Sequence, residues 1–81
     1  MGPIISQFLA RRPFVPFRIA MSDGGKYDVV RPDFAEVRTS AVDVFRPKPN
    51  SPNGRERRAM LSIPHITSVQ EIGDEPFEVV D

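Results

Sequence analysis

Hydrophobic and polar residues alternate along much of this 81-residue chain. Phe17, Ile19 and Met21 share one parity, and polar or small residues occupy the other. This period of two predicts a half-buried strand over residues 14–21. The run Ser-Asp-Gly-Gly that follows tolerates positive φ angles, so we expect a tight hairpin and a returning strand over residues 26–30.

The middle of the chain contains a second β-rich run. Pro32 removes a hydrogen-bond donor from the ladder, so residues 31–34 are expected to bend the chain. A strand is then expected over residues 37–45. Val42 and Val44 share a parity that does not match the start of this run, which indicates a bulge.

The later part of the chain alternates between polar and β-branched segments. Residues 46–57 contain three prolines and no other apolar residue, which predicts a solvent-exposed connection. A strand is expected over residues 58–63, and Pro64 interrupts it. Residues 66–72 carry apolar side chains three positions apart, which also fits a helix. Their β-branched residues favour a strand, entered through one turn at Pro64-His65.

The N-terminal segment predicts a short helix over residues 3–12. Pro3 suits a first helical position. Four apolar residues then form one stripe at helical spacing: Ile4, Ile5, Phe8 and Leu9. Pro13 ends the helix. Because about ten residues cannot hold a helix in water, it must pack against an apolar surface.

Together these elements predict one mainly β domain over residues 1–72 with a short N-terminal helix. About five short strands form a strongly bent antiparallel sheet, which closes most readily into a small, partly open barrel with the helix over one end. The acidic C-terminal tail, residues 73–81, is expected to trail from the domain. Alternatively, Phe77, Val79 and Val80 could dock as an added edge strand.

The composition limits how stable this domain can be. Its 40% hydrophobic and 27% charged residues are ordinary for a globular domain. A domain this small removes only about 60% of its unfolded surface from water. The sequence has no cysteine and no Cys/His cluster for a metal, so we expect good packing or oligomerisation instead. No apolar run is long enough for a bilayer or a signal peptide, so we expect a cytoplasmic protein without a membrane partner.

The net charge of zero conceals a strong asymmetry along the chain. All eleven basic residues lie at or before residue 58, together with six acids, which gives 11 − 6 = +5. The remaining residues hold five acids and no base, hence −5. Nine of the eleven bases are arginine, which binds carboxylates and phosphates in a forked geometry. The acidic end either shields a polyanion site or keeps a small protein soluble.

The residues that could carry chemistry are few. One histidine, no cysteine and no glycine-rich phosphate loop leave no nucleophile with its base, so we expect neither an enzyme nor a cofactor. Phe14, Phe17 and Phe34 are spaced for core packing rather than for stacking on bases. His65 fits a hydrogen bond to a nearby backbone carbonyl, with ligand contact as the alternative.

Five arginines are candidates for phosphate contact. Arg11 and Arg12 fit the end of a helix, where the macrodipole favours cations, as well as they fit a phosphate site. Arg55, Arg57 and Arg58 lie on or next to the polar connection and have no evident structural role. They are either solvated or act together on a polyanion.

The element order resembles the Sm-like small β-barrel family, in particular its Hfq-like bacterial RNA chaperones. The likeness rests on Phe8-Leu9, Arg11-Arg12, Val15-Pro16, Ile19 and Gly24, and on the run IPHITSV at residues 63–69. It covers residues 8–72. It implies an Sm/SH3-like barrel whose subunits pair edge to edge in a ring and bind single-stranded RNA.

Individual residues agree with this resemblance only in part. Arg11 and Arg12 match the basic rim of the family, and His65 matches its pore-side histidine. Pro64 stands where the family has lysine, and Ala20 where it has tyrosine. The proline-rich connection is also longer here.

A second resemblance covers the first half of the chain. The run PFVPFRIAMSDGGKYDVVRPDF, residues 13–34, is similar to a group of uncharacterised small bacterial proteins. They share a Pro-Phe-x-Pro-Phe lead and an Asp-Gly turn. This resemblance implies no activity.

Three functional hypotheses follow. The favoured one is a non-enzymatic small-barrel interaction module that self-associates through its sheet edges, which must be paired or covered. The alternative is a single-stranded RNA-binding protein that uses Arg11, Arg12, His65, Arg55, Arg57 and Arg58. The third is docking onto a partner protein by β-augmentation, with the acidic end against a basic surface.

Overall fold

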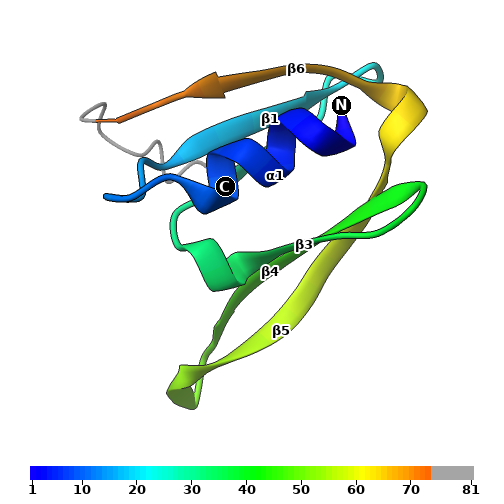
Figure 1. Ribbon diagram of the computed structural model, residues 1–81. Coiled ribbons are helices and arrows are strands. Elements are labelled where there is room, and N and C mark those ends of the chain that lie inside the picture. The colour runs from blue at the N-terminus through cyan, green and yellow to red at the C-terminus, as the bar shows by residue number, and fades with distance from the viewer. Residues whose placement is uncertain (74–81) are drawn as a thin grey trace.

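The computed structural model describes residues 1–73, apart from the side chains of Pro52 and Asn53. These residues form one helix, six strands and two 3-10 turns. In chain order the elements are α1 (Gly2–Ala10), β1 (Phe17–Met21), β2 (Lys26–Val29), η1 (Pro32–Phe34), β3 (Ala35–Val37), β4 (Ala41–Lys48), β5 (Ser51–Ser62), η2 (Ile63–His65) and β6 (Ile66–Glu71) (Figure 1). The predictions for the acidic tail after Gly73 lie outside the described residues.

The strands form two antiparallel sheets of three strands each. Their orders are β2-β1-β6 and β3-β4-β5. In the first sheet, Phe17 of the central strand lies between Val29 of β2 and Glu71 of β6. In the second sheet, Val44 of β4 lies between β3 and β5, opposite Ala35 and Ala59. The sheets enclose the core, and α1 runs beside β1 and above β3 (Figure 1).

The core forms where the inward parities of the two sheets meet. Its buried members come from α1, from η1 and from both sheets: Ile5, Phe17, Ile19, Val29, Phe34, Ala35, Val42, Val44, Leu61 and Ile66. The predicted burial of Phe17 and Phe34 is confirmed, and Phe14 packs half-buried against them. The ring centroid of Phe8 on α1 lies 5.1 Å from that of Phe17. The helix thus gains the apolar support that so short a segment needs.

The predicted hairpin between β1 and β2 is confirmed. Gly24 has a φ of 92°, a conformation that glycine adopts at little cost. The amide of Gly24 donates to the carbonyl of Met21, and the amide of Met21 donates to the carbonyl of Gly25. Asp23 accepts a bond from the amide of Gly25 through Oδ1 at 2.8 Å. Asp23, Gly24 and Gly25 therefore favour the turn over a longer loop.

The predicted single five-stranded barrel is not what residues 1–73 form. They form two separate three-stranded sheets and no closed barrel. Pro32 opens η1 between β2 and β3, and Pro64 lies in η2 between β5 and β6, so the chain changes sheet at both places. Proline lacks the amide that a continuous ladder needs, and the strands therefore end there instead of bending through.

One predicted strand, one predicted bulge and the end of the predicted helix also change. The predicted strand over residues 37–45 is divided into β3 and β4 by a turn, in which the amide of Arg38 donates to the carbonyl of Ala41 at 2.7 Å. The bulge that was expected near the start of this run lies instead between Val44 and Phe45, where Arg58 on β5 is the extra residue. The predicted helix over residues 3–12 ends at Ala10, because the backbone of Arg11 is already extended.

The predicted polar connection over residues 46–57 is largely strand. β4 continues to Lys48 and β5 begins at Ser51, with Arg46 opposite Glu56 and Pro47 opposite Arg55. Beyond Val44, β4 has no partner on its β3 side among the described residues. A proline is tolerated in such a strand when its missing amide faces the open side. The strand prediction failed here because apolar alternation is absent wherever both faces of a ribbon meet water.

Candidate functional site

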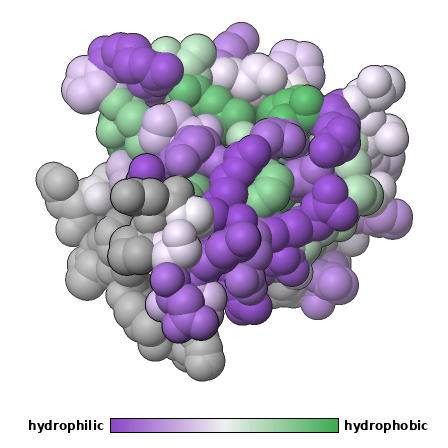
Figure 2. All heavy atoms as spheres, turned by 90° about the horizontal axis from the view of Figure 1, so that it is seen from below, coloured by the Kyte–Doolittle hydropathy of each residue, from purple (hydrophilic) through white to green (hydrophobic). Residues whose placement is uncertain are grey.

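The outward face of the β3-β4-β5 sheet gathers charged side chains. Glu36, Asp43 and Met60 lie opposite one another across the three strands, on the side away from the core. This sheet lies lowest in Figure 1, so Figure 2, which views the molecule from below, looks onto it. Hydrophilic residues dominate that view, with a small apolar area among them (Figure 2).

A buried carboxylate lies at the centre of this face. Asp43 is 0% exposed although it points away from the core. Its Oδ2 accepts a hydrogen bond from Nε of Arg38 at 2.6 Å and lies 3.6 Å from Nη2 of Arg57. Its Oδ1 is buried without a hydrogen-bond partner among the described residues. The two arginines therefore cover the carboxylate and exclude water from it.

The guanidinium of Arg38 stays charged over the ordinary range of pH. The hydrogen bond and the negative charge of Asp43 raise the pKa of Arg38 above its usual value. A raised pKa in the folded state contributes stability at every pH below the unfolded value and is lost only as pH rises through the folded one. Both values lie beyond the range in which proteins are handled, so the guanidinium stays charged.

Arg38→Ala is expected to lower the midpoint of urea unfolding more than Asp43→Ala does. The first change leaves a buried carboxylate with only the longer contact to Arg57, whereas the second leaves two guanidinium groups that are already 54% and 51% exposed. Urea titrations followed by circular dichroism measure both midpoints. A larger effect of Asp43→Ala would show that the carboxylate stabilises the arginines rather than the reverse.

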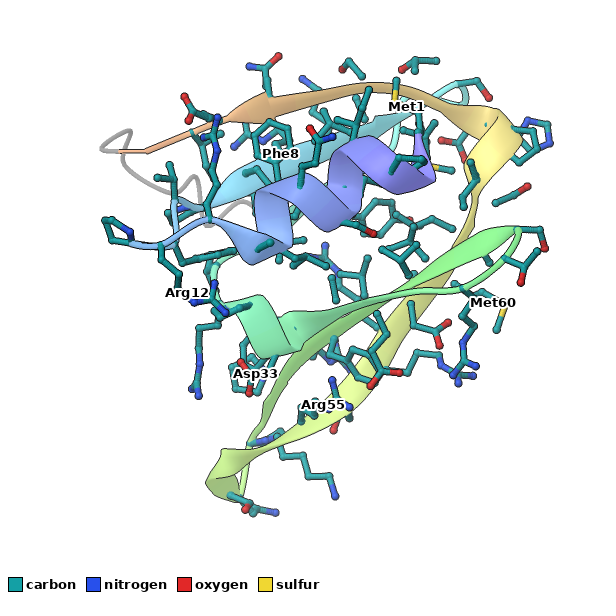
Figure 3. All side chains as sticks on the ribbon, viewed as in Figure 1. Met1, Phe8, Arg12, Asp33, Arg55 and Met60 are labelled. Carbon is teal, nitrogen blue, oxygen red and sulfur yellow. The ribbon has the colours of Figure 1, made fainter. Side chains whose placement is uncertain are left out.

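Arg55 forms a further set of contacts next to the group around Asp43. Arg55 donates to the carboxylate of Glu36 and to the backbone carbonyl of Asp33. Its guanidinium carbon lies 4.0 Å from the centroid of the Phe45 ring, which is a cation–π contact. Figure 3 shows Arg55 beside Asp33 below the body of the domain. Arg55 therefore joins the distal part of the β4–β5 hairpin to η1 and β3.

The other predicted arginines are engaged within the chain as well. Arg11 pairs with Glu71 and lies 4.8 Å over the ring of Phe8. Arg12 donates to the backbone carbonyls of Leu9 and Arg11. Both interactions stabilise the end of α1, which is the structural alternative that the sequence left open.

Arg58 and His65 lie apart from these groups. The guanidinium carbon of Arg58 lies 5.1 Å over the ring of Tyr27, so it bridges the two sheets. His65 is exposed in η2, and its backbone carbonyl accepts a bond from the amide of Ser22. The side-chain hydrogen bond predicted for the imidazole is not found among the described residues.

The six residues predicted to bind RNA do not form one surface. Glu71, the partner of Arg11, lies opposite Phe17 at one end of the β2-β1-β6 sheet, whereas Ile66, which follows His65, lies opposite Met21 at the other end. Arg55 and Arg57 reach Glu36 and Asp43, which lie opposite each other on β3 and β4, whereas Arg58 lies over Tyr27 of the other sheet. RNA binding by this set therefore stays a prediction.

Sequence reasoning missed Arg38 and Asp43. Asp43 alternates with two buried valines, so its parity points it away from the core and gives no sign that it is buried. The available signal was an acid in mid-strand with one arginine directly after β3 and another on β5, and its use requires the strand register. That register depends on the turn after Arg38, which the sequence did not locate.

The described residues offer little support for other kinds of site. An open groove between α1 and β3 is lined by Ser6, Leu9, Ala10 and Val37, and it holds no titratable group. Within residues 1–73, no group of three or more acidic, histidine or cysteine side chains could hold a metal ion. In the same part of the chain, no helix has the length and apolarity needed to cross a membrane.

No family model matches this sequence, and neither a curated protein nor a solved structure is detectably similar to it. The resemblance to the Sm-like family therefore stays a prediction. Function has to be argued from the geometry of this chain alone.

Proposed function

We propose that this protein is a non-enzymatic interaction module that self-associates through the open edges of its sheets. The observation that carries the proposal is the edge of β5 over residues 59–62. This segment pairs with β4 on one side and with no described strand on the other. Met60 within this segment is 56% exposed, the largest exposed fraction among the large hydrophobic side chains of the described residues. An unpaired edge with an apolar side chain favours pairing with another chain.

Other parts of the open edges are protected against such pairing. The part of β5 before Ala59 carries Arg55, Arg57 and Arg58, and charged side chains discourage edge-to-edge contact. Thr67 is an extra residue at the start of β6, and its hydroxyl donates to the carbonyl of Ala20 at 3.1 Å. Such a bulge disrupts an edge locally. Residues 59–62 have neither a charge nor a bulge of their own.

The arrangement of titratable groups supports a non-enzymatic role. Asp43 is covered by arginines, and the imidazole of His65 is exposed in η2 at the turn between the two sheets. A general acid or base has to reach its substrate within hydrogen-bond distance. The proposal therefore rests on surfaces and not on a catalytic pair.

Single-stranded RNA binding is the alternative proposal. The side chain of Arg57 is 51% exposed, and Arg58 is exposed beside it. Neighbouring cations of this kind supply affinity for phosphates. Against this, Arg55 and Arg11 are paired with carboxylates of the chain itself.

Met60→Lys is expected to reduce self-association at least tenfold. Pairing of a second strand with this edge would remove water from the new charge and bring two like charges close together, and both effects oppose association. Sedimentation velocity over a concentration series measures the association constant. Ile4→Lys is the matched control, since Ile4 is also an exposed apolar residue, 45% exposed, but lies on α1. A wild-type protein that stays monomeric at tens of micromolar refutes the proposal, and so does an equal effect of both substitutions.

A further inference from the structure

A two-stranded ribbon extends beyond the three-stranded part of the second sheet. β3 pairs with β4 only as far as Val44, whereas β4 and β5 stay paired beyond it. We call residues 45–57 the arm. In Figure 1 the arm is the hairpin that extends below the rest of the molecule. Among the described residues it has no third strand, so its two edges are open to a ligand.

The arm is predominantly basic. It has four basic residues and one acidic residue, which gives 4 − 1 = +3: Arg46, Lys48, Arg55 and Arg57 against Glu56. Arg46 is 60% exposed although it pairs with Glu56. Lys48 is exposed and forms no ion pair with another described residue. The distal end of the arm therefore presents uncompensated positive charge to solvent.

The arm is held against the body at Arg55, which lies opposite Pro47 near the distal end of the arm. Arg55 donates to Glu36 and to the carbonyl of Asp33 while it stacks on Phe45 (Figure 3). These contacts come from the arm itself, from η1 and from β3. They hold the direction of the ribbon before any ligand arrives, which reduces the entropy that binding would cost.

We propose that the arm binds in the major groove of double-stranded DNA, chiefly through phosphate contacts. The major groove of B-form DNA is about 12 Å wide and admits a two-stranded ribbon. The major groove of an RNA duplex is too narrow for side chains to enter, and a single strand offers no groove. The site is separate from the edge at residues 59–62, so it does not depend on self-association.

Fluorescence anisotropy with a labelled 20-base-pair DNA duplex and the full chain tests the proposal over a series of salt concentrations. The double variant Arg46→Ala/Lys48→Ala is expected to weaken binding about 10- to 100-fold at 0.1 M salt. Its log–log salt slope should fall by about 1.8, since each lost phosphate contact removes about 0.9. Circular dichroism checks that the variant is folded.

The matched control is Lys26→Ala/Arg31→Ala, which removes the same charge outside the arm. It is expected to change the affinity less than about threefold, because a diffuse field contributes little once salt screens it. Equal weakening by both double variants overturns the proposal, because it would assign binding to net charge alone. No binding of the duplex at 50 mM salt also overturns it, and so does preferential binding of oligo-A or oligo-U RNA or of a polyglutamate peptide.

Discussion

Phe17→Ala is expected to destabilise the folded protein by about 3–5 kcal/mol. Phe17 is 0% exposed, and its ring contacts those of Phe8 and Phe14 at centroid distances of 5.1 and 6.1 Å. Removing it leaves a cavity where α1, β1 and the segment between them meet. At 0.05–0.15 kcal/mol per residue, a chain of this length has a total stability of roughly 4–12 kcal/mol. We therefore expect the variant to be partly or wholly unfolded at 25 °C, as measured by urea denaturation.

Phe17→Leu is the control for this prediction. Leucine retains most of the apolar volume, so we expect a loss below about 1.5 kcal/mol. If both variants lose the same stability, the aromatic contacts and not the filled volume determine the effect. If neither loses more than about 1 kcal/mol, the packing described for Phe17 is wrong.

Ile5→Ala is expected to cost about 2–5 kcal/mol and to detach α1 from the sheets. Ile5 is the fully buried large side chain of α1, and Phe8 and Leu9 are only half-buried. A helix of nine residues is not stable alone in water, so undocking and unfolding of α1 are coupled. Hydrogen exchange measured by NMR should then show loss of protection at the amide of Ile5, which donates to the carbonyl of Met1.

The neighbouring residue supplies a matched control. Ile4→Ala removes the same chemical groups from a side chain that is 45% exposed, and we expect a change within about 0.5 kcal/mol. Equal losses for the two variants would mean that both act through helix propensity. The packing of α1 by its buried stripe would then be refuted.

The local features of the fold were predictable from the sequence. Alternation located β1, and β-branched residues located β6. The run Ser-Asp-Gly-Gly located the first hairpin because few other conformations suit it. Pro32 and Pro64 marked the ends of strands for the same local reason. The interpretation of residues 66–72 as a strand rather than a helix is also supported, since β6 covers residues 66–71.

The division into two sheets was not predictable in the same way. A bent strand and two strands joined by a proline turn give the same alternation, and the pattern cannot say which occurs. The arm illustrates a related limit, because its strands are recognised by their pairing and not by an apolar face. Prolines and polar residues there indicated a loop, while the register places Pro47 opposite Arg55 within a ribbon.

The candidate sites depended still more on long-range contacts. Arg11 and Glu71 are sixty positions apart, and Arg55 and Glu36 nineteen. Their pairing assigns structural contacts to arginines that the sequence left available for phosphate. Lys48, at the end of the arm, has no such contact among the described residues.

The sequence by itself determined a small, mainly β domain with one short helix, its first hairpin and its core residues. These properties depend on backbone preferences and on burial, and both are encoded within a few neighbouring positions. The tertiary structure alone decided that Asp43 is buried under arginines, that residues 45–57 project as a basic ribbon and that the other arginines are mostly engaged. Each of these depends on which strands become neighbours, because an ion pair forms between charges that are close in space and can be far apart in the sequence.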